Sequence, residues 1–267
     1  MVSRLDEQRA LDCTRELIQF LRNEGYEVIL EKGTAQALGK EGVPFSELSG
    51  DIAVVVGGDG SVLLTVQRLK KQIPILGVNQ GKVGFLTELE PEEAHAFFRQ
   101  IRTEGFRVEK RMRISLNADG LYLGEALNEA VVVTSRPAKM LHFSIIIDGI
   151  TAERFRADGT IIATPTGSTA YAMSGGGPIV DPRIEGILLV PLAPYLLSSR
   201  PHLISSDRSL RIMLESDKPA RLVLDGQHTC ELQNGTILEI TKSTEPAQFV
   251  DVGKSFFVKV DKKLRRL

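Results

Sequence analysis

The first hundred residues alternate between amphipathic segments and short apolar runs. Residues 6–24 predict a helix, and Gly25 is well placed to end it. The positions expected to face the core of this helix recur at helical spacing, and they are Ala10, Leu11, Thr14, Leu17, Ile18 and Leu21. The sequence YEVIL at residues 26–30 follows as a predicted short strand.

Two buried strands, each followed by a helix, are predicted next. Residues 51–56, DIAVVV, are apolar without alternation, which is typical of a strand covered on both faces. A helix is predicted over 61–70 and a second buried strand over 73–79. The following helix, over 91–105, begins with Pro and two acidic residues and ends at Gly. Strands that alternate with helices in this way predict a doubly wound parallel sheet.

Beyond residue 105 the pattern changes to strand-like stretches broken by Asp-Gly and Asn-Gly pairs, which favour tight turns between antiparallel strands. We therefore expect a fold of class α/β plus all-β. The α/β domain would span residues 1–105, and a larger, mostly antiparallel β domain would span residues 106–267. The basic tail at 254–267 is expected to be a solvated surface segment. Packing of the C-terminal tail on the first domain stays open as an alternative.

The composition excludes several classes of function. A formal net charge of −1 gives no basic footprint for nucleic acid. No apolar run approaches the roughly 20 residues of a membrane span, and the polar N-terminus does not resemble a secretory signal. Cys13 and Cys230 lie far apart without metal-ligand spacing, which favours a reduced chain. These observations predict a cytoplasmic protein that binds neither nucleic acid nor a membrane.

The sequence GGDGS at residues 57–61 follows the predicted strand at 51–56. In α/β proteins, ligands bind in the crevice at the C-terminal ends of the parallel strands. Glycines at such an end let a phosphate approach the backbone N–H groups. Asp59 stands among these glycines, where a metal ion or a reactive hydroxyl would explain it. A helix cap is the alternative. The P-loop motif and the common dinucleotide motif are both absent, and the four scattered histidines have no metal-ligand spacing.

A second cluster spans residues 156–178, RADGTIIATPTGSTAYAMSGGGP. A predicted strand is followed here by small and hydroxyl-bearing residues, which favour a binding loop whose backbone is open to a ligand. Tyr171 offers an aromatic face on which a base can stack. Asn128 and Glu129 are neighbours, so they can reach one ligand only if the strand is interrupted beside them.

Together these segments resemble the NAD kinase family. The resemblance rests on GGDGS (57–61), GVNQGKVGFLTE (77–88), LNEAVV (127–132), residues 156–180, SSRP (198–201) and DGQ (225–227). It implies an enzyme that phosphorylates the 2′-hydroxyl of the adenosine ribose of NAD, with the active site between the two domains. The wider superfamily of GGDG kinases for lipids or sugar phosphates, and a non-catalytic NAD or NADP sensor, are the alternatives.

The resemblance also implies roles for individual residues. Asp59 would be the catalytic aspartate, and a set of residues would bind the substrate: Asp59, Gly60, Asn128, Glu129, Lys139, Arg156, Asp158, Thr169, Ala170, Tyr171, Ala172, Met173, Ser174 and Gln227. The donor would be ATP or polyphosphate. A divalent ion, most simply Mg²⁺, would neutralise its phosphates, although no ligands for the metal are identified. A homodimer or homotetramer is implied. The short start, MVS, is not expected to supply the family's usual first strand.

Overall fold

The computed structural model describes residues 1–80, 84–136, 139–196 and 198–264. The chain forms two compact units. The first contains Met1–Lys110 and Ala247–Leu267, and the second contains Arg111–Pro246. The sequence analysis assigned residues 106–267 to the second domain and left open whether the C-terminal tail packs on the first; in the structure the segment from Ala247 onward belongs to the first unit.

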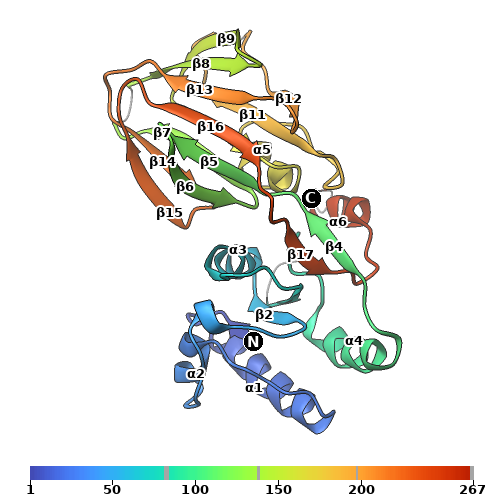
Figure 1. The fold of residues 1–267 in the computed structure, drawn as a ribbon. Helices are drawn as coiled ribbons and strands as arrows, with labels where there is room; N and C mark the ends of the chain where they lie inside the picture. The colour runs from blue at the N-terminus through green and yellow to red at the C-terminus, as the bar shows by residue number, and fades with distance from the viewer. Residues whose placement is uncertain (81–83, 137–138, 197, 265–267) are drawn as a thin grey trace. The chain divides into compact units, whose positions relative to one another are not determined.

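The first unit is built on a five-stranded sheet with the order β1–β2–β3–β17–β4 (Figure 1). The strands are β1 (Val2–Ser3), β2 (Ala53–Gly57), β3 (Ile75–Asn79), β17 (Ala247–Val250) and β4 (Val108–Arg111). Strand β2 is parallel to both β1 and β3, and β17 is parallel to β3. All five residues of β2 are buried, as the apolar run without alternation predicted.

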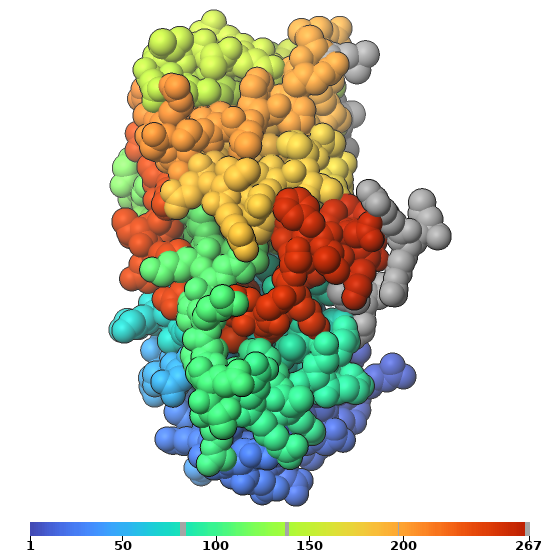
Figure 2. Space-filling model, turned by 90° about the vertical axis from the view of Figure 1, so that its right-hand side faces the viewer, coloured from blue at the N-terminus to red at the C-terminus, as the bar shows by residue number. Residues whose placement is uncertain are grey.

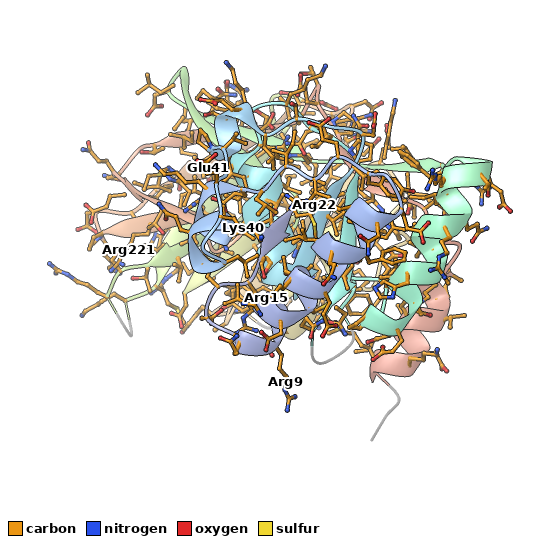
Figure 3. The ribbon with its side chains drawn as sticks, turned by 90° about the horizontal axis from the view of Figure 1, so that it is seen from below. Arg9, Arg15, Arg22, Lys40, Glu41 and Arg221 are labelled. Carbon is orange, nitrogen blue, oxygen red and sulfur yellow. The ribbon has the colours of Figure 1, made fainter. Side chains whose placement is uncertain are left out.

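Helices α1 (Gln8–Asn23) and α4 (Pro91–Glu104) share one hydrophobic cluster with β2 and β3. Leu17 and Phe98 of the two helices join Val54 and Val56 of β2 in it, so Val55 between them points to the opposite face of the sheet. Figure 3 looks at α1 from below and labels Arg9, Arg15 and Arg22 on its exposed side. Helix α3 (Asp59–Arg68) follows β2 directly.

Two local expectations in the first unit were wrong. Residues Val2–Ser3 do form a strand, paired with Val55 and Val56, so MVS supplies the first strand. Residues 26–30 are not a strand, because they make no ladder beyond the isolated bridge of Glu31 with Val43. The short helix α2 (Lys32–Ala37) and the 3-10 turn η1 (Phe45–Glu47) were not predicted. The basic tail forms helix α6 (Phe256–Leu264), a surface helix in which most residues are exposed or partly exposed and Lys259 is buried.

The second unit contains two antiparallel six-stranded sheets. One has the order β12–β11–β10–β7–β14–β15 and the other β6–β5–β16–β13–β8–β9. The strands are β5 (Ile114–Ala118), β6 (Leu121–Ala126), β7 (Glu129–Thr134), β8 (Leu141–Ile147), β9 (Ile150–Ala157), β10 (Gly159–Ala163), β11 (Gly186–Leu192), β12 (His202–Ser205), β13 (Leu210–Leu214), β14 (Ala220–Leu224), β15 (His228–Leu232) and β16 (Ile237–Lys242).

One hydrophobic core joins the two sheets, with Val132 and Ile162 from the first and Leu116 and Phe143 from the second. The other face of the first sheet is covered by the short helix α5 (Tyr171–Ser174), whose Ala172 packs with residues of β10 and β11. Strand β10 is therefore buried on both faces, although it lies in an antiparallel sheet.

The predicted Asp-Gly turns are confirmed. Asp119–Gly120, Asp148–Gly149 and Asp225–Gly226 all have positive φ at both residues and connect adjacent antiparallel strands. Positive φ at both residues is typical of a type I′ turn, whose twist matches that of a hairpin. The first two loops contain only the Asp-Gly pair, whereas Gln227 adds a third residue after Asp225–Gly226. No helix within the described ranges is long and apolar enough to cross a membrane.

Candidate active site

Asp59 is the first residue of α3, directly after the buried strand β2. Its side chain does not cap α3, and it accepts hydrogen bonds from a segment that follows β3. Oδ2 accepts from the N–H of Phe85 at 2.7 Å. Oδ1 accepts from the N–H groups of Leu86 and Thr87 at 2.9 and 3.1 Å and from the Thr87 hydroxyl at 3.2 Å. The helix-cap alternative for Asp59 is therefore wrong, and the carboxylate organises residues 85–87.

Glycines let this segment and Asp59 approach closely. A Cβ on Gly84 would lie 2.1 Å from Asp59 Oδ1 and 2.0 Å from the Thr87 hydroxyl. Gly57 has φ +157° at the end of β2, so a side chain there would be strained. Gly60 lies in the first turn of α3 with open space where a Cβ would stand. Gly57 thus allows the turn after β2, and Gly84 allows the close approach of residues 84–87 to Asp59.

In the second unit the chain is interrupted beside Asn128 and Glu129, as predicted. Strand β6 ends at Ala126 and β7 begins at Glu129, so two residues lie between the strands. The buried carboxylate of Asp225 holds this break. Its Oδ2 accepts from Leu127 N–H at 2.8 Å, and its Oδ1 accepts from the N–H groups of Asn128 and Glu129 at 2.8 and 3.0 Å. Asp225 therefore replaces the strand pairing that these three donors lack.

Thr164 and Gly167, which follow β10 in the chain, contact the same break at residues 127–128. The Thr164 hydroxyl donates to the carbonyl of Leu127 at 2.5 Å and accepts from the N–H of Gly167 at 3.1 Å. The N–H of Thr164 donates to the carbonyl of Asn128 at 2.8 Å. A Cβ on Gly167 would lie 2.1 Å from that same carbonyl oxygen. Residue 167 must therefore be glycine for the break to keep this conformation.

The side chains of Asn128 and Glu129 are buried, and each has an oxygen without a hydrogen-bond partner. These oxygens are Asn128 Oδ1 and Glu129 Oε2, unpaired within the part of the chain that the structure describes. Burial, and secondarily the charge of Asp225, raise the pKa of Glu129 to about 7, although the N–H of Tyr171 hydrogen-bonds to it. Unpaired buried acceptors are costly, so this arrangement suits a ligand that supplies donors.

Residues 166–174 were predicted to be an open loop, and this was wrong. They form the 3-10 turn η2 (Thr166–Thr169) and helix α5, and η2 is buried throughout. Tyr171 remains 47% exposed, so its ring is accessible. Thr169 is buried, Ala170 and Met173 are partly buried and Ser174 is exposed. Ala172 is fully buried in the hydrophobic cluster with β10 and β11, so its methyl group has a packing role.

The remaining predicted residues of the second unit lie on other elements. Asp158 is partly buried between β9 and β10, and its backbone hydrogen-bonds with Leu192 and Thr134. Arg156 is exposed on β9, with its guanidinium 5.1 Å from the centre of the Tyr195 ring. Lys139 is exposed outside regular structure, and Gln227 is exposed after the Asp225–Gly226 turn. Among the described residues, no hydrogen bond or ion pair joins these side chains to the break at residues 127–128.

Sequence reasoning missed Asp225, Thr87, Thr164 and Gly167 as parts of the site architecture. Asp225 lies in the DGQ sequence, where its Asp-Gly turn already explained an Asp. Its carboxylate acts on residues 96 to 98 positions earlier, which no local pattern reports. Thr164 and Gly167 were quoted only as members of a small-residue stretch. Thr87 lies 28 residues from Asp59 and was quoted only as part of the segment GVNQGKVGFLTE.

Comparison with known proteins assigns both halves of the chain. Residues 1–106 match the profile of the ATP-NAD kinase N-terminal domain, and residues 127–252 match that of the ATP-NAD kinase C-terminal domain. An NAD kinase of Methanoculleus marisnigri is 62% identical over 267 residues, covering 100% of this chain and 98% of the relative. An NAD kinase of Methanoregula boonei is 60% identical with the same coverage.

Two solved structures share the fold. An NAD kinase from Archaeoglobus fulgidus, solved in complex with ATP, has a TM-score of 0.79 and 32% identity, with 95% of each chain covered. A yeast NADH kinase, solved with NADH, has a TM-score of 0.88, with 96% of this chain and 83% of that chain covered. Its 24% identity makes it evidence of fold alone. Two matching domain profiles and full-length similarity to several NAD kinases show that this chain belongs to the NAD kinase family.

Proposed function

We propose that the protein transfers a phosphoryl group from ATP to the 2′-hydroxyl of the adenosine ribose of NAD and so forms NADP. The observation that carries this proposal is the group of buried acceptors beside an accessible aromatic ring. Asn128 Oδ1 and Glu129 Oε2 lack partners in the described chain, and the backbone of Tyr171 hydrogen-bonds to Glu129. The adenosine half of NAD supplies hydroxyl and amino donors together with a planar base, which fit these groups.

Asp59 is proposed as the base for the reacting hydroxyl. Its Oδ1 already accepts three hydrogen bonds, whereas Oδ2 accepts one, from Phe85. A carboxylate oxygen has two lone pairs, so Oδ2 retains the capacity to take a proton. In this step the ribose oxygen bonds to the γ-phosphorus, the bond from that phosphorus to ADP breaks, and the hydroxyl proton moves to Asp59 Oδ2. The four hydrogen bonds to Asp59 fix the position of the carboxylate.

A divalent ion is proposed to accompany the donor. Among the described residues no group of three or more His, Cys, Asp or Glu side chains could hold a metal. Mg²⁺ keeps several waters and binds through one or two carboxylates and substrate phosphates, so it does not need such a group. When bound, the ion would neutralise charge on the transferred phosphoryl group.

Formation of NADP from NAD and ATP is therefore expected to require a divalent ion. The purified protein would be incubated with NAD, ATP and Mg²⁺, and NADP would be measured enzymatically. Chelation with EDTA should abolish the product, and excess Mg²⁺ should restore it. Polyphosphate in place of ATP tests the second proposed donor. Turnover that survives full chelation would contradict the metal requirement.

Replacement of Tyr171 by Ala is expected to weaken NAD binding about tenfold or more, because base stacking on an aromatic ring contributes roughly 1–3 kcal/mol. The KM for ATP should change much less. Calorimetric titration of NAD and steady-state kinetics would measure both effects, with Tyr171→Phe as the control that keeps the ring. An equal change in both substrates would show that Tyr171 maintains the shape of α5 without contacting the base.

Two further predictions come from the sequence and the family resemblance. The protein is proposed to form a homodimer or homotetramer, which light scattering after size-exclusion chromatography would determine. A cytoplasmic location, with Cys13 and Cys230 reduced, is also proposed. Both cysteines are free in the structure, and burial raises the pKa of each thiol, which favours unreactive thiols.

A further inference from the structure

Helix α6 directs two lysines toward the segment that holds Asp59. Lys259 and Lys263 are four residues apart and so share one face of the helix. In Figure 2 this helix (red) lies next to the blue-green segment that contains α4. Lys259 is 6% exposed and is paired with the carboxylate of Glu88. Lys263 is also partly buried, with 28% of its side chain exposed.

The surroundings of Lys263 differ from those of Lys259. Its ammonium lies 3.8 Å from Asp59 Oδ2 and 4.0 Å from the centre of the Phe85 ring. A separation of 3.8 Å is too long for a hydrogen bond, and the described residues provide no hydrogen-bond acceptor for this ammonium. Burial lowers the pKa of Lys263, and the charge of Asp59 opposes that effect. Lys263 thus retains hydrogen-bonding capacity beside the proposed catalytic carboxylate.

Helix α6 and the residues just before it have attachments to the first unit other than those of Lys263. Lys254 donates to the carbonyl of Glu88 at 2.9 Å and pairs with Glu93, and the rings of Phe256 and Phe85 lie 6.3 Å apart. Lys259 adds the buried pair with Glu88. A lysine with three donors and no hydrogen-bond acceptor is therefore better explained by a ligand than by helix anchoring.

The charge of this group suits the donor's phosphates. The sequence has no P-loop motif, whose lysine would contact the β- and γ-phosphates. Phosphoryl transfer depends on cations that offset charge on the phosphate oxygens. An ammonium is a compact cation for this purpose. The ammonium of Lys263 lies 3.8 Å from Asp59 Oδ2. If Asp59 accepts the proton of the ribose 2′-hydroxyl, the transferred phosphoryl group has to come close to this ammonium.

We propose that Lys263 is a donor-binding residue of the phosphoryl transfer, with its ammonium donating to an oxygen of the transferred phosphoryl group. This rests on the proposed NAD kinase reaction. Lys263 keeps its proton throughout, while the hydroxyl proton moves to Asp59 and ADP leaves with the electron pair of the broken P–O bond. The residue thereby supplies, from the C-terminal helix, the positive charge that a P-loop lysine supplies elsewhere.

The test compares Lys263→Ala and Lys263→Arg with Lys262→Ala, a control at an exposed lysine of the same helix. Steady-state kinetics would vary ATP and NAD separately, calorimetry would measure NAD binding without donor, and thermal unfolding would check the fold. Loss of one charge-assisted hydrogen bond predicts that kcat/KM for ATP falls about 10- to 100-fold in Lys263→Ala. Affinity for NAD should stay within about twofold, Lys263→Arg should recover most of the activity, and Lys262→Ala should match the parent protein.

The outcomes separate this inference from the proposed function. If the parent protein makes no NADP, the proposed function fails. If it does and Lys263→Ala has unchanged or higher kcat/KM for ATP, the donor-binding role is overturned. A loss of activity that accompanies a lower unfolding temperature, with weaker NAD binding and no recovery in Lys263→Arg, would make Lys263 an anchor of α6 and would also overturn it.

Discussion

Replacement of Asp59 by Asn is expected to lower kcat by roughly the 10²–10⁴-fold that general acid–base catalysis contributes. Asn keeps Oδ1 and its hydrogen bonds from Leu86 and Thr87, but it replaces the second oxygen by an NH₂ group. That group cannot accept a proton, and it would face the N–H of Phe85. NAD binding should survive. Rapid-mixing measurement of a single turnover would isolate the chemical step from product release.

A structural role for the same carboxylate needs its own control, because Asp59 also holds residues 85–87. Thr87→Val removes the hydroxyl that donates to Oδ1 and leaves the carboxylate intact. If Asp59 is the base, Thr87→Val should retain kcat within about tenfold, since it loses one hydrogen bond of ordinary strength. If both variants lose kcat equally and both unfold at lower temperature, Asp59 acts through the segment and is not the base. A near-normal kcat for Asp59→Asn would also end the catalytic role.

The second large effect concerns pH and Glu129. Its pKa is about 7 in the folded protein, against 4.5 for an unperturbed glutamate. Between these values the folded protein keeps a proton that the unfolded chain has lost, so the stability from this group is full below pH 4.5 and disappears as pH rises through 7. Raising the pH from 5 to 8.5 should cost roughly 2–3 kcal/mol of unfolding free energy through Glu129 alone.

Glu129→Gln should remove this dependence, because Gln stays neutral at both values. Urea unfolding at pH 5 and pH 8.5 would measure the difference between parent and variant at each pH, and that difference should shift by roughly 2–3 kcal/mol in favour of Gln at pH 8.5. Glu231→Gln, at an exposed residue of β15, is the control that should show no such shift. Parallel pH profiles for the parent and Glu129→Gln would refute the burial of an ionisable carboxyl group there.

NAD should reduce the cost of ionising Glu129. A ligand hydroxyl that donates to Oε2 favours the charged carboxylate and lowers its pKa. The stabilisation by saturating NAD should therefore be larger at pH 8.5 than at pH 5 in the parent, and this difference should vanish in Glu129→Gln. Equal stabilisation by NAD at both values would mean that NAD does not contact this carboxylate.

Several elements follow from local features of the amino-acid sequence. The run at 51–56 contains strand β2 because it is apolar throughout, and α4 runs from Pro91 to Glu104 because Pro, acidic residues and Gly105 define its ends. Asp-Gly pairs favour turns in which both residues have positive φ, and the three pairs therefore predicted three connections between adjacent antiparallel strands. The interruption beside Asn128 and Glu129 was expected only from the family resemblance, which directs both side chains to one ligand although neighbouring strand residues point to opposite faces.

The contacts between groups far apart in the sequence depend on the folded chain. Strand β1 has two residues, too few for any pattern, and it exists because Val55 and Val56 pair with it. The sequence of residues 26–30 is typical of a strand, but these residues form no ladder with a neighbouring strand. Strand propensity depends on pairing and packing in the folded chain, so it does not by itself produce a strand. Asp59 meets residues 26 to 28 positions later, and Asp225 meets residues 96 to 98 positions earlier. Hydrogen bonding and burial depend on distance in space, so the architecture around Asp59 and the raised pKa of Glu129 arise only in the folded chain.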